Sequence, residues 1–127
     1  MPKRLTDTTK WDRQWFLEMP VEYRFFWTYI CDRCDHAGIW HKDFGMASFL
    51  IGAQIEEGRA LAYFGDRIKE ISGDKWYLVG FIRFQYGTYC QKKNVHKSAM
   101  RILVANGLHW PWQGLGKALP RPWHKDK

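Results

Sequence analysis

The stretch that decides the fold covers residues 20–41 and reads PVEYRFFWTYICDRCDHAGIWH. Apolar side chains recur in it at three- and four-residue spacing, which is the period of one face of an α-helix. These side chains are Tyr23, Phe26, Trp27, Ile30 and Cys34. Phe25 and Tyr29 extend the apolar surface to a second face. We therefore expect a central helix over about 20–35 that packs against more than one neighbour.

Both ends of this helix carry boundary signals. Pro20 suits the first turn of a helix, where its missing N–H is not needed. Gly38 is placed to end the helix or to turn the chain just after it, and residues 39–41 are expected to form a very short strand. Upstream, residues 1–19 are expected to be a polar arm, docked on the body through the apolar residues 15–17 (WFL).

Three more helices are predicted further along the chain. Asp43 caps a short helix that Gly52 ends, and a longer helix covers about 55–66. A last helix covers about 95–106 and stops at Gly107. Their inward-facing residues are expected to be Phe44, Ala47, Leu50 or Ile51, Ala60, Leu61, Phe64, Val95, Ala99, Ile102 and Leu103.

A β-hairpin is predicted between the last two of these helices. Two β-rich runs, 68–71 and 75–79, flank a Gly-containing turn of hairpin length at 72–74. Aromatic residues alternate in part over 81–86, so the second strand is expected to continue through that segment. Gly87 then ends it.

The predicted order is helix, short strand, helix, helix, hairpin, which is typical of a winged helix, a helix-turn-helix unit with a β-hairpin wing. The sequence thus predicts an α+β fold, mostly α, with a further C-terminal helix. Three parts are expected: an N-terminal arm over 1–19, a winged-helix domain over 20–107, and a basic tail with Trp and Pro over 108–127.

Three motifs resemble the N-terminal winged-helix region of phage replisome-organiser and DnaD-like replication-initiation proteins. They are residues 34–40 (CDHAGIW), 47–52 (ASFLIG) and 81–87 (FIRFQYG), the last followed by His96-Lys97. The resemblance covers about 11–107, and its motifs are mostly apolar, so they specify the fold better than the activity. It implies DNA binding at a replication origin, or self-assembly into a replication-initiation complex. Longer relatives carry a second domain that can recruit helicase machinery.

The charge of the chain is concentrated at one end. Residues 1–87 hold 12 Lys and Arg and 12 Asp and Glu, whereas residues 88–127 hold 8 Lys and Arg and one acid, Asp126. The whole excess of +7 therefore belongs to the last third. We expect this end to attract a polyanion, DNA and preferably the duplex, in a salt-dependent way. The alternative is a basic tail that only aids solubility.

Two parts of the predicted winged helix are candidate DNA contacts. On the helix over about 55–66, Arg59, Tyr63 and Arg67 would face a groove, where Arg can read guanine or bind phosphate. Glu56 and Glu57 in its first turn argue against this because they repel phosphates, and the alternative is a solvated face with an Arg59–Glu56 pair. The predicted wing carries Lys69 and Lys75, which would contact the DNA backbone or merely protect the edge of the sheet.

The strongest basic group is expected near the last helix. Lys93, Lys97 and Arg101 are four residues apart and share one helical face, and Lys92 precedes them. We expect all four to contact phosphates; the alternative is an exposed helix face that is merely charged. Lys117, Arg121, Lys125 and Lys127 in the tail, near Trp123, could add contacts that do not depend on sequence.

A second hypothesis is a protein–protein module that assembles a replication complex as a homo-oligomer or with a replication-protein partner. Its basis is the number of Trp residues in the arm and tail, because aromatic side chains are enriched at interface centres. They are Trp11, Trp15, Trp110, Trp112 and Trp123. A transcriptional regulator is a variant of the DNA-binding hypothesis.

One motif, Cys31-x2-Cys34-x-His36-x4-His41, has the residue types that bind zinc in proteins. Both Cys residues lie within the aromatic helix, where free Cys behaves as a small apolar residue, and the His spacing is irregular for a zinc finger. No metal or cofactor is therefore predicted, and whether Cys31, Cys34, His36 and His41 bind a metal is left open.

No catalytic residues are predicted, since the sequence has no G-x-S-x-G, H-E-x-x-H or G-x-G-x-x-G motif. The segment 114–118 (GLGKA) lacks the glycine spacing and the Ser or Thr of a phosphate loop. No apolar run is long enough to span a bilayer. Three Cys without an export signal indicate reduced thiols in the cytoplasm.

Overall fold

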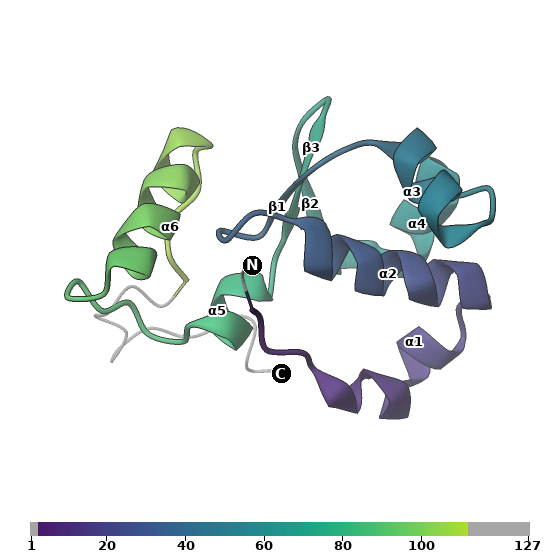
Figure 1. Cartoon of the computed structure of the whole chain (residues 1–127), viewed down its shortest axis with the longest axis horizontal. Helices are drawn as coiled ribbons and strands as arrows, with labels where there is room; N and C mark the ends of the chain where they lie inside the picture. The colour runs from purple at the N-terminus through teal and green to yellow at the C-terminus, as the bar shows by residue number, and fades with distance from the viewer. Residues whose placement is uncertain (1–2, 112–127) are drawn as a thin grey trace.

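The computed structural model describes residues 3–111 of the chain, which form an α+β fold rich in helix (Figure 1). Two 3-10 helices, η1 and η2, are present with the helices α1–α6 and strands β1–β3. In chain order the elements are η1 Thr8–Asp12, α1 Gln14–Leu17, α2 Val21–Arg33, β1 Ile39–His41, α3 Phe44–Ile51, α4 Glu57–Phe64, η2 Gly65–Arg67, β2 Ile68–Ser72, β3 Lys75–Leu78, α5 Phe81–Gln85 and α6 Asn94–Ala105.

The strands form a three-stranded antiparallel sheet in the order β1-β3-β2. Trp76 on the central strand lies opposite Trp40 of β1 and Glu70 of β2. The predicted hairpin is confirmed, with a register irregularity between Glu70 and Ser72 just before the turn. The order of elements and the strand pairing are compatible with the predicted winged helix.

The prediction that α2 is central is confirmed. Phe26, at its midpoint, is fully buried, and its ring lies within 5.5–6.2 Å of rings contributed by β1, α3, α4 and β3. These partners are Trp40, Phe44, Phe64 and Trp76. Aromatic rings in such edge-to-face and offset arrangements stabilise a core beyond the area that they bury. Helices α2, α3 and α4 and strands β1 and β3 thus meet at this one residue.

The capping predictions for α3 are also confirmed. The Asp43 carboxylate accepts a hydrogen bond of 3.0 Å from the backbone N–H of Met46, and Gly52 ends the helix in the left-handed region at φ 88°. Here an L side chain would be strained, which is why glycine is suited to the position.

The segment after β3 is not a continuation of the strand, so the expectation for 81–86 is wrong. Residues 81–85 form helix α5, and both Phe81 and Ile82 are buried. The backbone bonds here are helical, because the Phe84 N–H donates to the Gly80 carbonyl and the Tyr86 N–H donates to the Ile82 carbonyl. The ladder ends where the Val79 N–H donates to the Arg67 carbonyl, and Gly80 follows with φ −90° and ψ 0°.

Two smaller expectations are also corrected. Val95 does not face inward: 45% of it is exposed, and its neighbour His96 is buried instead. The N-terminal arm is partly helical, with η1 and α1, and it docks through Phe16, which is fully buried. Within residues 3–111, no helix has both the length and the apolar character needed to cross a membrane.

Candidate nucleic-acid interface

Helix α6 separates its residues into a buried face and a basic face. His96, Ala99 and Leu103 point into the body of the protein, while Lys93, Lys97 and Arg101 are exposed along the opposite side, next to the exposed Lys92. In the described part of the chain, none of these four cations forms an ion pair. The structure therefore brings together the four residues that the sequence assigned to phosphate contact.

Polar contacts fix the orientation of this helix. His36 Nε2 lies 2.7 Å from Ser98 Oγ, and Lys75 Nζ donates to Asn106 Oδ1 at 3.2 Å. The two contacts tie the middle and the end of α6 to the loop before β1 and to the start of β3. Because the buried side of the helix is held at two points, its basic side is held facing solvent.

His96 completes the attachment from the start of the helix. Its ring packs against Tyr86, Tyr89 and Trp110, and its Nδ1 accepts a hydrogen bond from the Cys90 N–H at 3.0 Å. Burial, and then the charge of Lys93, lower the pKa of His96. The neutral ring is the form that can accept this hydrogen bond, so the environment favours the form on which the contact depends.

On α4 the structure brings together two of the three residues assigned to base reading. The Arg59 guanidinium donates to the Tyr63 hydroxyl at 2.9 Å and lies over the rings of Tyr23, at 5.0 Å, and Tyr63, at 5.7 Å. The hydrogen bond to Tyr63 is the main cause that raises the pKa of Arg59, ahead of the Glu56 charge. The alternative Arg59–Glu56 ion pair is not formed among residues 3–111.

Arg67 does not lie beside Arg59 and Tyr63, although their four-residue spacing predicted that all three would share one helical face. Helix α4 ends at Phe64, and Gly65, the first residue of η2, turns the chain with φ 59°. The Arg67 guanidinium instead stacks on the Trp15 ring, 3.9 Å from its centroid, and donates to the Phe64 carbonyl at 3.2 Å. Burial lowers its pKa, so this cation belongs to the packing of the N-terminal arm.

The two carboxylates that argued against DNA binding at α4 differ in their surroundings. Glu57 forms an ion pair with Lys42 at 2.7 Å, the one salt bridge within the described residues. Glu56 is exposed at the N-cap and has no side-chain capping bond. The ion pair halves the negative charge that a phosphate would meet at this end of α4. This role of Lys42 was not predicted from the sequence, because its partner Glu57 lies 15 residues away in the chain.

The two lysines assigned to the wing are separated by the structure. Lys69 lies exposed on β2, where it can meet a ligand. Lys75 is half-buried, and its ammonium is directed to Asn106 at the end of α6. Lys75 therefore has a structural contact, which leaves Lys69 as the exposed cation of the hairpin.

The Cys and His residues of the zinc-like spacing have other surroundings. Cys31, Cys34 and Cys90 are free, and burial raises the pKa of both Cys31 and Cys34 to about 12, so that they remain thiols rather than the thiolates that zinc binds. The His36 ring is bonded to Ser98. In residues 3–111, no three His, Cys, Asp or Glu side chains are grouped to hold a metal ion.

The remaining candidates lie outside the described residues: Trp112, Lys117, Arg121, Trp123, Lys125 and Lys127. Comparison of the chain with protein-family models, with curated proteins and with solved structures finds no match.

Proposed function

We propose that this chain is a DNA-binding winged-helix protein that acts in phage or mobile-element replication initiation, without catalysing a reaction itself. The observation that carries DNA binding is the exposed row of cations at α6, free of ion pairs within residues 3–111. The replication role rests on the resemblance of the sequence motifs.

The spacing of the row suits a phosphate backbone. Successive members of the set Lys93, Lys97 and Arg101 are separated by about 6 Å along the helix axis, since each residue adds about 1.5 Å. Unpaired cations keep their full charge for a polyanion, and each phosphate contact releases counterions from DNA. Surface rows of this kind bind DNA without regard to sequence.

Sequence preference is assigned to α4. The hydrogen bond to Tyr63 limits the conformations of Arg59, so less side-chain entropy is lost when its guanidinium binds a base edge. Arg can bind guanine in the major groove through two hydrogen bonds. A transcriptional regulator would use the same surfaces, and the identity of the neighbouring genes distinguishes it from a replication protein.

The second candidate function is a module for protein–protein assembly. A group of large apolar side chains on α2 and α3 is exposed, with Phe49 at 80% and Phe25 at 54%. Its members are Val21, Phe25, Met46, Phe49 and Leu50. Exposed large apolar side chains gain free energy when a partner buries them, and self-assembly at an origin would provide such a partner.

The test of DNA binding is an anisotropy titration with labelled duplex and single-stranded DNA at two salt concentrations. Binding that weakens steeply with salt supports the proposal, and absence of binding at low salt overturns it. Light scattering over a range of concentrations tests assembly. A strict monomer at high concentration would leave the exposed apolar group without the proposed role.

A further inference from the structure

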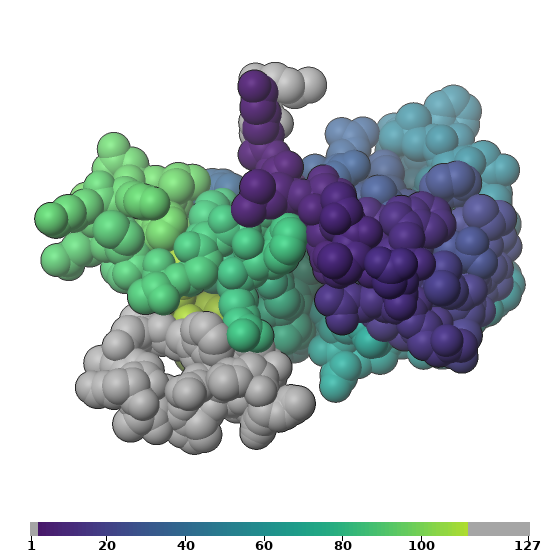
Figure 2. All heavy atoms as spheres, turned by 90° about the horizontal axis from the view of Figure 1, so that it is seen from below, coloured from purple at the N-terminus to yellow at the C-terminus, as the bar shows by residue number. Residues whose placement is uncertain are grey.

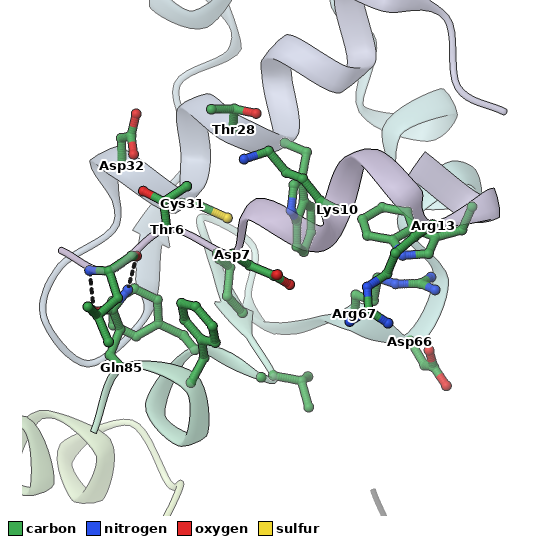
Figure 3. Close-up of a pocket in the computed structure, with 18 residues that line it drawn as sticks. Thr6, Asp7, Lys10, Arg13, Thr28, Cys31, Asp32, Asp66, Arg67 and Gln85 are labelled. Carbon is green, nitrogen blue, oxygen red and sulfur yellow. Dashed lines mark hydrogen bonds between the residues drawn. The ribbon is translucent and has the colours of Figure 1, made fainter. Parts of the chain in front are cut away.

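A cavity of about 490 Å³ lies beneath the N-terminal arm, away from α6 (Figure 3). It is open to solvent on one side and is lined by residues of the arm and α1, by α2, by η2 and by the segment 78–85. Cavities of about 300–1,000 Å³ accommodate small organic molecules. In Figure 1, η1 and α1 lie at the opposite end of the molecule from α6, and Figure 2 shows the same separation. The cavity is thus separate from the proposed phosphate contacts at α6 (Figure 1), and none of its lining residues is a proposed DNA contact.

The arm that covers the cavity is held by noncovalent contacts. The Leu5 N–H donates to the Gln85 side-chain oxygen at 3.0 Å, and the Gln85 amide donates back to the Leu5 carbonyl at 2.7 Å. Arg4 donates to the carbonyls of Cys31 and Asp32, each at 3.0 Å. These four bonds hold Arg4 and Leu5 against the end of α2 and against α5.

Much of the cavity wall is apolar and aromatic. Trp15 and Trp27 meet edge to face at 5.2 Å, and Phe81 and Phe84 line the wall contributed by α5. Phe84 remains 45% exposed. A wall of this composition favours a ring-sized apolar body, because burying it removes apolar surface from water on both sides.

One end of the cavity is positively charged. Arg13 and Arg67 lie side by side there, with Lys10 nearby (Figure 3). Arg13 donates to Thr9 Oγ1 at 3.1 Å and Arg67 to the Phe64 carbonyl at 3.2 Å. Since neither forms an ion pair within residues 3–111, most of the five N–H donors of each guanidinium are open to a ligand.

The cavity also contains three acids, of which Asp7 and Asp66 lie close to these cations (Figure 3). The Asp7 carboxylate accepts bonds from the backbone N–H and the hydroxyl of Thr9, which cap η1. Asp66 lies beside Arg67, whereas Asp32 lies at the other side of the hollow (Figure 3). The group formed by the three cations Lys10, Arg13 and Arg67 and the two acids Asp7 and Asp66 therefore keeps one net positive charge.

We infer that this cavity binds a small amphipathic anion, with its apolar ring system against the aromatic wall and its single carboxylate, phosphate or sulfonate on Arg13 and Arg67. Guanidinium groups bind such anions through paired, charge-assisted hydrogen bonds. The ligand occupies a site that no DNA contact uses, so this inference does not rest on the proposed function.

The test uses two fluorescent probes that differ by one sulfonate, 8-anilinonaphthalene-1-sulfonate and uncharged N-phenyl-1-naphthylamine. We expect the sulfonate to bind the full chain with one-to-one saturation and the uncharged probe to bind more weakly. Arg13→Gln combined with Arg67→Gln is expected to weaken the sulfonate about tenfold or more and to leave the uncharged probe unchanged. Arg33→Gln is the matched control, since Arg33 is exposed and outside the cavity.

Arg67 packs on Trp15, so Arg13→Gln alone, on an exposed side chain, serves as the second variant if the double variant does not fold. Equal binding of both probes, or sulfonate binding that Arg13→Gln leaves unchanged, overturns the inference. Loss of binding in Phe49→Ser, which alters the exposed apolar group instead, also overturns it.

Discussion

The His36 ring nitrogen and the Ser98 hydroxyl oxygen lie 2.7 Å apart, although 62 residues separate them in sequence. This bond joins the loop before β1 to the middle of α6. It connects the aromatic core to the helix that carries the proposed phosphate contacts.

Ser98→Ala removes this bond and is expected to lower the free energy of unfolding by about 1 kcal/mol, the usual net contribution of one hydrogen bond. Urea unfolding followed by circular dichroism measures it. Thr88→Ala, at an exposed position, is the control and should cost little. Equal stability of Ser98→Ala and the wild type would show that the bond does not hold α6.

Lys97→Ala combined with Arg101→Ala should weaken binding to all DNA sequences alike. Because each phosphate contact contributes about 0.9 to the slope of log affinity against log salt, the slope should fall by about 2. Anisotropy titrations at several salt concentrations measure it. Lys97→Arg with Arg101→Lys keeps both charges and should keep the wild-type slope; an unchanged slope in the alanine variant would exclude this face.

Arg59→Ala is expected to alter sequence preference rather than general affinity. The discrimination between duplexes that differ by one base pair should change about fivefold or more, as measured by competition titration. Tyr63→Phe removes the hydroxyl that holds Arg59 while keeping its charge, and should give a smaller change in the same direction. Identical preferences in all three proteins would remove α4 from the interface.

Trp76 and Trp110 form a matched pair for testing a buried donor. Both are fully buried; the Trp110 indole donates to the Gly87 carbonyl at 2.9 Å, whereas the Trp76 indole N–H has no acceptor within the described residues. Trp→Phe loses the same volume at each site. Trp110→Phe should therefore cost about 1 kcal/mol more than Trp76→Phe, measured by denaturant unfolding. The reverse order would mean that the Trp76 indole is satisfied.

The lowered pKa of His96 predicts a pH dependence. The unfolded chain binds the proton more tightly than the folded one, so stability is full above about pH 6.5 and is lost as the pH falls through the folded pKa. Thermal unfolding at pH 8 and pH 5.5 measures the loss. His96→Asn retains an acceptor but does not titrate, and should show a smaller difference between the two pH values; an equal difference would exclude His96 as the cause.

Most of the elements between residues 20 and 79 could be predicted from the sequence, because their signals are local. The spacing around Phe26, the Asp43 cap and the Gly-containing hairpin turn each act within a few residues. The strand expected over 81–86 is a helix instead, because the antiparallel ladder stops at Val79 and the chain turns at Gly80, which the alternation within 81–86 does not reveal.

The candidate DNA contacts could be predicted only where all of the residues concerned belong to one helix. Lys93, Lys97 and Arg101 share a face by spacing alone, whereas Arg67 left its expected face because Gly65 ends α4 early. The cavity could not be foreseen, since it depends on contacts such as Leu5 with Gln85, which are 80 residues apart.

The early end of α4 at Gly65 also sets how much DNA this helix could read. Eight residues give a helix of about 12 Å, which is the rise of three to four base pairs at about 3.4 Å each. A DNA site of only three to four base pairs recurs by chance throughout any genome. If α4 binds DNA, occupancy of one particular locus would therefore require more base contacts than a single copy of this helix supplies.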